Sequence, residues 1–255
     1  MNVHALAPRE PARGPLSGLG IVVTRPARQA GAFAQKLAAL GATPIAWPAI
    51  VILPPDDPAP LARVHATLDR YDLAFFISAN AAEYGAPPVG RWPARLSAYA
   101  PGPGTAEALA GVGVPGARVP ATSFDSEGKR VIIFRGSGGR EQLAEALAQR
   151  GATVESVDCY RRAAPAGDAH GIVDVLREGR AHALTLTSSE GADNLMRAAG
   201  DEGRALLARL PAFVPHPRIA DRVRALGLDA RLTPGGDAGL IAGLLEWARA
   251  RTTSA

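Results

Sequence analysis

The sequence contains very little lysine and cysteine, and it has no long hydrophobic run. Lysine occurs only at Lys36 and Lys129, so arginine supplies almost all of the positive charge. A GC-rich genome is the simplest explanation, although guanidinium groups also suit carboxylate or phosphate ligands. The single cysteine, Cys159, excludes a disulfide framework and fits a reducing cytoplasm. We therefore expect a cytoplasmic protein that does not enter a membrane, with a flexible tail over residues 1–17 and a frayed end over residues 249–255.

The usual motifs for cofactors, metals and nucleophiles are also absent. The glycine loop at residues 136–139 fits neither Gly-x-Gly-x-x-Gly nor the P-loop pattern. The five histidines show no metal-ligand spacing, and Ser188-Ser189 is not flanked as a nucleophile elbow. No basic patch with interleaved aromatic residues suggests nucleic acid. We expect no metal, no cofactor and no nucleic acid, and an enzyme here would work by holding a reactive substrate.

The clearest pattern that is present lies in residues 131–162. The apolar run 131–134 predicts a buried strand, and the glycine-rich loop 135–140 follows it. Residues 141–150 have helical spacing and Gly151 ends them. A second strand at residues 153–159 then delivers Tyr160, Arg161 and Arg162 at its end. This order makes one βαβ unit.

The rest of the chain repeats this alternation. The segments that match are 21–25 with 131–135, 36–43 with 145–153, 73–80 with 183–190, and 96–109 with 210–223. Further predicted elements are a helix at 27–40, an extended segment at 45–53, helices at 61–70 and 106–110, and a last helix at 237–250 with Asp237 as a plausible N-cap. The order predicts an α/β protein of two doubly wound, mostly parallel-sheet domains that arose by internal duplication.

Candidate binding residues follow from the rule that ligands bind at the carboxyl ends of parallel strands. Small, hydroxylated and basic residues occur there beside helix N-termini, which suits anions. An ordinary role as helix N-caps is the alternative for the Ser and Thr residues. The candidates are Thr24, Arg25, Ser78, Asn80, Gly104, Thr105, Arg135, Gly136, Ser188, Ser189, Pro217 and Arg218.

Tyr160 stands apart from these residues because it ends an apolar strand just before two arginines and the linker 165–167. That position places a phenol at a predicted domain crossing. A tyrosine that caps the edge of a core is the alternative.

Several of these segments together resemble the uroporphyrinogen-III synthase family, over about residues 20–245. The segments that carry the resemblance are Val23-Thr24-Arg25-Pro26, Phe76-Ile77-Ser78-Ala79-Asn80, Gly102-Pro103-Gly104-Thr105-Ala106, Ile133-Phe134-Arg135-Gly136, Gly139-Arg140-Glu141-Gln142-Leu143, Tyr160-Arg161-Arg162 and Thr187-Ser188-Ser189. Each segment is weak alone, and their order and spacing make the resemblance specific.

The resemblance implies two α/β domains joined by a two-stranded ladder, with a cleft between them. One domain would contain residues 1–48 and 163–255, and the other residues 49–162; a sequential split near residue 125 is the competing arrangement. The implied reaction is cyclisation of hydroxymethylbilane to uroporphyrinogen III, with inversion of ring D through a spiro intermediate and loss of water. Tyr160 would assist departure of the hydroxyl, and Thr105, Ser188 and Ser189 would bind substrate.

The chain departs from the family pattern in two places. Family members usually have a hydroxyl-rich segment where this chain has His216-Pro217-Arg218-Ile219, so Arg218 would replace a hydroxyl as a carboxylate contact. They also have a longer, helical connection where Glu127 here runs directly into Gly128. The partners expected are hydroxymethylbilane and, transiently, the preceding enzyme of the pathway, with the chain a monomer. A non-catalytic binding protein for a small anionic metabolite is the alternative function, and a sugar-nucleotide transferase fits less well because it needs a clearer diphosphate loop.

Overall fold

The chain packs as two compact units in the computed structural model, which describes residues 14–119, 125–139, 141–165 and 170–253. Unit 1 contains Met1–Val51 and Ala164–Ala255, and unit 2 contains Ile52–Ala163. Unit 1 is therefore built from two separate stretches of the sequence. The predicted domain boundaries lie at residues 48/49 and 162/163, and this division into domains stays a prediction. Each unit is described separately below.

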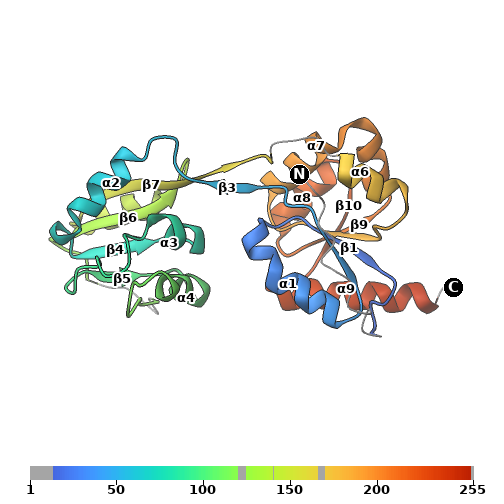
Figure 1. Ribbon diagram of the computed structural model, residues 1–255, viewed down its shortest axis with the longest axis horizontal. Coiled ribbons are helices and arrows are strands. Elements are labelled where there is room, and N and C mark those ends of the chain that lie inside the picture. The colour runs from blue at the N-terminus through green and yellow to red at the C-terminus, as the bar shows by residue number, and fades with distance from the viewer. Residues whose placement is uncertain (1–13, 120–124, 140, 166–169, 254–255) are drawn as a thin grey trace. The chain divides into compact units, whose positions relative to one another are not determined.

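Unit 1 is a five-stranded sheet with helices on both faces, and its strand order is β10-β9-β8-β1-β2 (Figure 1). All neighbouring strands pair in parallel. The elements are β1 (Gly20–Val23), α1 (Ala27–Ala39), β2 (Thr43–Ala46), α6 (His170–Arg177), β8 (Ala183–Thr185), α7 (Ser189–Leu207), β9 (Pro211–Val214), α8 (Pro217–Ala225), β10 (Asp229–Leu232) and α9 (Gly236–Thr253).

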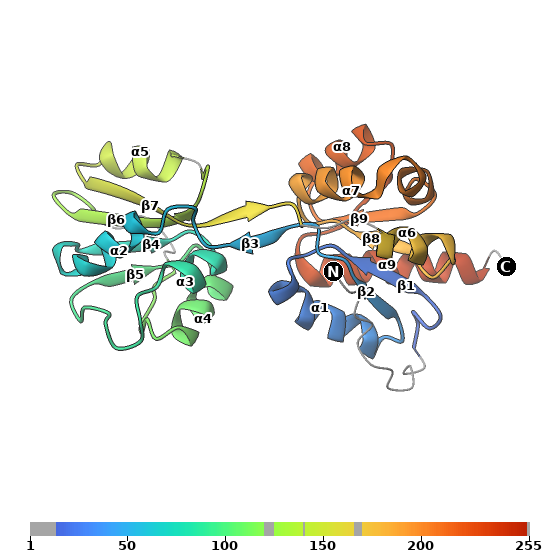
Figure 2. The same ribbon diagram turned by 45° about the horizontal axis from the view of Figure 1, so that its top comes forward.

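Alternate residues of β1 enter two cores, as the period of a strand requires. Ile21 and Val23 pack with Phe33 of α1 and Leu244 of α9. Val22 instead joins the core that α6, α7 and α8 cover. The helices therefore lie on opposite faces of the sheet, with α7 and α8 on one side and α1 on the other (Figure 2).

Unit 2 has a second sheet, of order β3-β7-β6-β4-β5. The pairs β7-β6, β6-β4 and β4-β5 are parallel. The elements are β3 (Val51–Leu53), α2 (Ala59–Ala66), a short 3-10 helix (Leu68–Arg70), β4 (Leu73–Phe76), α3 (Ala79–Gly85), β5 (Ser97–Tyr99), α4 (Pro103–Gly111), β6 (Arg130–Gly136), α5 (Gln142–Ala148) and β7 (Thr153–Ala163).

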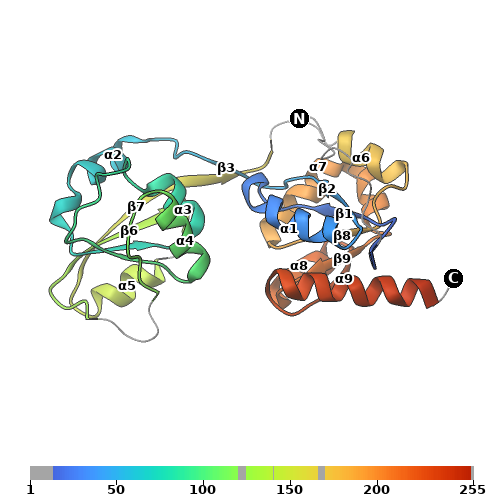
Figure 3. The same cartoon turned by 60° about the horizontal axis from the view of Figure 1, so that its bottom comes forward.

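The two faces of this sheet are covered unequally. Phe76 and Phe134 stack 4.4 Å apart in the larger core, beneath α2, α3 and α4. Phe75 and Ile133 point to the smaller core, where Leu147 of α5 covers them. Figure 3 shows α2 and α5 on opposite sides of β6. This arrangement confirms the predicted α/β fold with two mostly parallel sheets.

The two sheets have the same order once each strand is replaced by its counterpart in the sequence repeat. The order β2-β1-β8-β9 of unit 1 corresponds to β7-β6-β4-β5 of unit 2. The first strand–helix–strand segment of each repeat thus lies in the sheet of the other repeat. An origin by duplication stays a prediction.

The structure corrects three expectations. Leu16 is fully buried and its N–H donates to the carbonyl of Leu40, so the predicted flexible tail is wrong there. Helix α9 continues to Thr253 instead of fraying at residue 249. Asp237 lies inside the first turn of α9 and is not its N-cap. Residues 1–13 and 254–255 lie outside the described part of the chain, in which no helix is long and apolar enough to cross a membrane.

Candidate functional site

Ser78, at the carboxyl end of β4, begins helix α3. Its backbone is extended, and its Oγ accepts a hydrogen bond of 3.1 Å from the N–H of Ala81. The predicted N-cap role is therefore confirmed for this residue. The same Oγ lies 3.2 Å from the hydroxyl oxygen of Tyr160, so Ser78 contacts the phenol as well as capping the helix.

Tyr160 lies inside β7 and not at its end as predicted, because β7 continues to Ala163. The pairing of β6 with β7 shifts between Arg135, which faces Asp158, and Gly136, which faces Tyr160. This bulge turns Cys159 and Tyr160 into the same core, where they are 0% and 1% exposed. An unbroken strand would have pointed Tyr160 to the opposite face.

The Tyr160 hydroxyl has two polar neighbours. Ser78 Oγ is one, and the Nη2 atom of Arg162, 3.5 Å away, is the other. The guanidinium of Arg162 also lies 5.9 Å from the centre of the Tyr160 ring, and Tyr84 packs against that ring at 6.3 Å. Several side chains thus hold the phenol in place, and almost none of its surface is exposed to solvent.

Arg135 points away from Tyr160, to the other face of the sheet. Its Nε donates to Asp158 at 3.0 Å and its Nη1 donates to Glu141 at 2.5 Å. Burial alone would lower the pKa of Arg135, but these two carboxylates raise it above its ordinary value. Arg135 is therefore a charged residue that is already paired in this structure.

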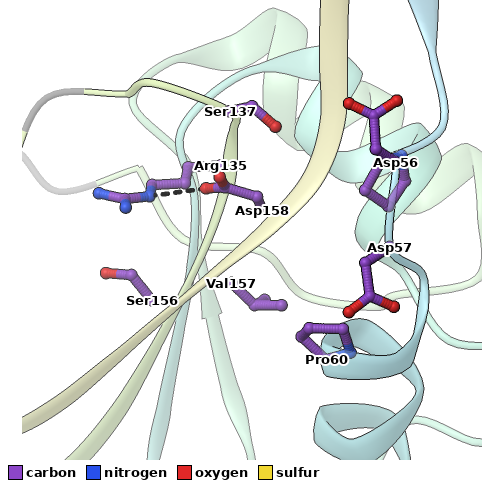
Figure 4. Close-up of a pocket in the computed structure, with 9 residues that line it drawn as sticks. Asp56, Asp57, Pro60, Arg135, Ser137, Ser156, Val157 and Asp158 are labelled. Atoms are coloured by element: carbon purple, nitrogen blue, oxygen red, sulfur yellow. Dashed lines mark hydrogen bonds and ion pairs between the residues drawn. The ribbon is translucent and has the colours of Figure 1, made fainter.

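A pocket of about 370 Å³ lies beside β7 in unit 2, lined by residues of β6 and β7 and by the segment that leads into α2 (Figure 4). Its lining includes the carboxylates of Asp56, Asp57 and Asp158, against the single guanidinium of Arg135. Asp56 pairs with Arg161 at 2.7 Å, and Asp57 accepts from the N–H of Ala59 at 2.9 Å. A ligand rich in carboxylates would meet an excess of negative charge here, so this pocket does not suit an anionic substrate.

Helix α4 carries the candidates that follow β5. Gly102 is its N-cap residue, Gly104 is exposed in its first turn, and Thr105 is 8% exposed. The first-turn N–H groups of such a helix favour anions. Asn80, in the first turn of α3, is half-buried.

In unit 1 the first two candidates have structural partners. Thr24 is buried, and its Oγ1 donates to the carbonyl of Thr185 at 2.8 Å. Arg25 pairs with Asp237 at 2.6 Å, and its guanidinium lies 4.5 Å from the centre of the Phe33 ring. These contacts tie the end of β1 to α1 and α9.

The remaining candidates of unit 1 lie at the N-termini of α7 and α8. Ser188 caps α7, since its Oγ accepts from the N–H of Gly191 at 2.9 Å, and Ser189 beside it is half-buried. Pro217 and Arg218 are exposed in the first turn of α8, where His216 is the N-cap. These residues offer N–H, hydroxyl and guanidinium groups to an anion.

The structure brings together some of the predicted residues and separates others. Tyr160, Ser78 and Gly136 form one cluster in unit 2, whereas Arg135 belongs to the opposite face. Sequence reasoning missed Arg162 as a neighbour of the phenol, although its position two residues further along a strand is a usable signal. Within the described residues, no group of three or more His, Cys, Asp or Glu side chains could hold a metal ion.

The sequence of this chain matches the model of a known protein family. A family model described as "Uroporphyrinogen-III synthase HemD" matches residues 31–236. The chain belongs to the uroporphyrinogen-III synthase family. The resemblance inferred from the sequence is thereby confirmed, and cyclisation of hydroxymethylbilane is the known function of this family.

Individual relatives agree with this assignment. The uroporphyrinogen-III synthase of Salmonella typhimurium is 35% identical over 162 residues, which is 57% of this chain and 66%, just under two thirds, of that protein. The one from Synechococcus elongatus is 32% identical over 202 residues, 72% of this chain and 75% of that protein.

Solved structures of this family share the fold. A uroporphyrinogen-III synthetase crystal structure from Helicobacter pylori has a TM-score of 0.61 at 14% identity, covering 90% of this chain and 99% of that one. A mutant uroporphyrinogen III synthase from Thermus thermophilus has a TM-score of 0.52 at 19% identity, with coverages of 91% and 99%. At these identities the likeness concerns the fold alone.

Proposed function

We propose that this chain cyclises hydroxymethylbilane to uroporphyrinogen III, with inversion of ring D and loss of water. Membership of the family supports the reaction, and the held phenol of Tyr160 beside Ser78 is the structural observation that supports its chemistry. We also propose that the reaction needs no cofactor, because the substrate itself supplies the electrons that expel its hydroxyl.

The chemistry requires little from a conventional acid or base. The pyrrole nitrogen helps the hydroxyl to leave, which gives an azafulvene cation. The substituted carbon of the last ring attacks that cation to form a spiro intermediate, which reopens and closes again with the ring inverted. The protein has to assist departure of the hydroxyl and to hold the substrate so that the spiro geometry is favoured over direct closure.

Binding of the substrate's carboxylates would fall to the helix N-termini of both units. In unit 2 we propose Asn80, Gly104 and Thr105 as contacts, and in unit 1 Ser188 and Ser189 together with Pro217 and Arg218, which stay predictions from the sequence. Backbone N–H groups and hydroxyls there can donate to carboxylates without burying a charge of the protein. Arg218 is exposed and can form a two-point contact with a carboxylate.

Arg25 and Arg135 are less suited to this role than their position in the sequence suggests. Each guanidinium is already paired with a carboxylate of the protein, Asp237 for Arg25 and Asp158 for Arg135. A substrate carboxylate would have to replace that partner. We propose that both arginines, with Thr24, support the strand ends instead of contacting the substrate.

Isomer analysis tests the function directly. The purified chain is incubated with hydroxymethylbilane generated by a separate enzyme, and the products are oxidised and separated by chromatography. We expect the inverted isomer to dominate, whereas the substrate alone gives the uninverted one. A product that contains only the uninverted isomer would refute the proposal, and tight binding without turnover would favour the binding-protein alternative. A cytoplasmic location, a monomeric state and contact with the preceding enzyme stay predictions.

A further inference from the structure

The Tyr160 hydroxyl is too enclosed to meet a substrate directly. The residue is 1% exposed, and its oxygen contacts Ser78 and Arg162. Ser78 is only partly buried and stands at the first residue of the turn that leads into α3. Of the two hydroxyls that contact each other, the one that a ligand can reach is therefore the serine.

Counting donors fixes the direction of the hydrogen bond between them. Arg162 and the N–H of Ala81 can only donate, so the phenol oxygen accepts from Arg162 and Ser78 Oγ accepts from Ala81. If Ser78 donated to Tyr160, the buried phenol proton would have no acceptor among the residues that the structure describes, which is costly. If Tyr160 donates to Ser78, the buried phenol is satisfied and the serine proton is left for an acceptor outside this pair.

We propose that Ser78 is the proton donor to the departing hydroxyl, and that Tyr160 acts behind it as the source of the replacement proton. This inference rests on the proposed function and names the group that touches the substrate. Ser78 thereby becomes a catalytic residue, and the phenol contributes through it.

The step balances in atoms and charge. As the carbon–oxygen bond breaks, the departing oxygen takes the serine proton and leaves as water, while Ser78 Oγ takes the phenol proton. Tyr160 becomes a phenolate beside the Arg162 guanidinium, and the substrate carries the azafulvene cation. When the inverted ring recovers its aromaticity, it releases one proton, which returns along the same pair of oxygens. No oxidant, reductant or further reactant is needed.

Arg162 is a positioning residue in this scheme. Its guanidinium is close enough to stabilise the negative charge that develops on the phenol oxygen, and its N–H fixes which way the phenol proton points. The neighbouring Arg161 pairs with Asp56, a residue of the acidic pocket lining. Substitution of Arg161 is therefore a matched control for substitution of Arg162, because the two residues are adjacent and have the same side chain.

A double-mutant cycle tests the relay. The variants Tyr160→Phe and Ser78→Gly are compared singly and together, because glycine removes the hydroxyl while costing little as an N-cap. General acid catalysis typically contributes about 10²- to 10⁴-fold, and because the hydroxyl already leaves readily we expect each single variant to lower kcat by about 100-fold, the low end of that range, with a small change in KM. We expect the double variant to be no slower than the slower single variant, since both remove the same relay.

Three controls separate the relay from a structural effect. Ser78→Thr keeps both hydroxyl and cap, and we expect it to restore most of kcat. Ser188→Gly removes an N-cap of the same geometry that contacts no phenol among the described residues, so the fold-loss of kcat that it causes should multiply with that of Tyr160→Phe. Arg162→Gln should lower kcat while Arg161→Gln does not, and Arg162→Lys should recover part of the loss. Thermal unfolding of every variant verifies that it is folded at the assay temperature.

Rates in mixtures of light and heavy water give a readout that packing alone would not change. We expect two protons to move together in the wild type, seen as a curved dependence on the deuterium fraction, and a loss of that curvature in Ser78→Gly. Suppose that the wild type forms the inverted product, but the fold-losses of kcat in Tyr160→Phe and Ser78→Gly multiply in the double variant. That result would overturn the relay and leave the proposed function standing. Absence of inverted product from the wild type would overturn the proposed function and the relay with it.

Discussion

Gly136 lies directly against the ring of Tyr160. A Cβ atom at this glycine would be 2.6 Å from Cζ and 2.9 Å from the hydroxyl oxygen of Tyr160, closer than non-bonded carbon atoms approach. The two residues face each other across β6 and β7, immediately after the shift in pairing. Position 136 therefore requires glycine because the phenol leaves no room for a Cβ atom, and not because the backbone has a positive φ.

We predict that Gly136→Ala both destabilises unit 2 and lowers activity. The methyl group has to displace the Tyr160 ring, and overpacking of this kind costs about 1–3 kcal/mol. Displacement of the ring also disturbs the contact with Ser78. Urea unfolding gives the change in the free energy of unfolding, and isomer analysis gives the change in activity.

Gly31→Ala is the matched control for this substitution. Gly31 is exposed in α1 and a Cβ there would meet nothing within 4 Å. Alanine in a helix should stabilise the protein by about 0.5–1 kcal/mol relative to glycine. If Gly136→Ala were as stable and active as the wild type, the close approach of Gly136 to Tyr160 would be contradicted.

The position of Tyr160 shows where sequence reasoning stops. Alternation of apolar residues predicts the strand and its parallel neighbours, because that period follows from backbone geometry. The bulge at residues 158–160 inserts one residue and reverses the side to which Tyr160 points. In the sequence, Cys159 and Tyr160 stand next to each other and break the alternation of apolar residues, which is a local sign of the bulge.

The arginines show a second limit. The rule about strand ends places Arg25 and Arg135 at the correct edge of their sheets, but it cannot say what they bind. Arg25 pairs with Asp237, which is 212 positions away in the chain. A partner at such a distance is set by the fold, so it could not be predicted from the residues around β1.

We predict that Tyr160→Phe slows turnover more than Thr105→Val, Ser188→Ala or Ser189→Ala. In the proposed relay the phenol replaces the proton that Ser78 gives to the departing hydroxyl, whereas we propose that the other three side chains contribute to binding. We expect a change mainly in kcat for Tyr160→Phe and mainly in KM for the others. Steady-state kinetics with the inverted isomer as product measures both constants. An equal or smaller loss in Tyr160→Phe than in any of the other three would count against a role for the phenol.

We predict that Asp237 gives the protein a stability that depends on pH. Burial alone would raise the pKa of Asp237, but hydrogen bonds from Lys36 and Arg25 lower it below its ordinary value of 3.8. A lowered pKa in the folded state stabilises the protein above the unfolded pKa, and this contribution disappears as the pH falls through the folded pKa. Asp237→Asn should therefore cost about 1 kcal/mol at neutral pH and little in acid.

Urea unfolding of wild type and Asp237→Asn at several pH values between about 7 and 3 measures this difference. Asp221→Asn serves as the control, because Asp221 forms an exposed pair with Arg224 and should contribute at most about 0.5 kcal/mol. A difference between wild type and Asp237→Asn that stayed constant over this range would mean that the Arg25–Asp237 pair does not set the pKa of Asp237.

We predict that Cys159 is inert toward thiol reagents in the folded protein. Burial raises the pKa of its thiol to about 12, its side chain is 0% exposed, and its Sγ lies 3.1 Å from the carbonyl oxygen of Arg135. Since the thiolate is the reactive form, both access and charge state protect this residue. A disulfide reagent should label the native protein only as fast as β7 opens, and should label the urea-unfolded protein at once. Because Cys159 is the one cysteine of the sequence, the signal belongs to this site alone.

Two variants serve as controls for the labelling of Cys159. Tyr160→Phe keeps the ring that covers the strand and should leave the labelling rate unchanged, whereas Gly136→Ala should increase the rate. Rapid labelling of the native wild type would contradict the burial of this strand.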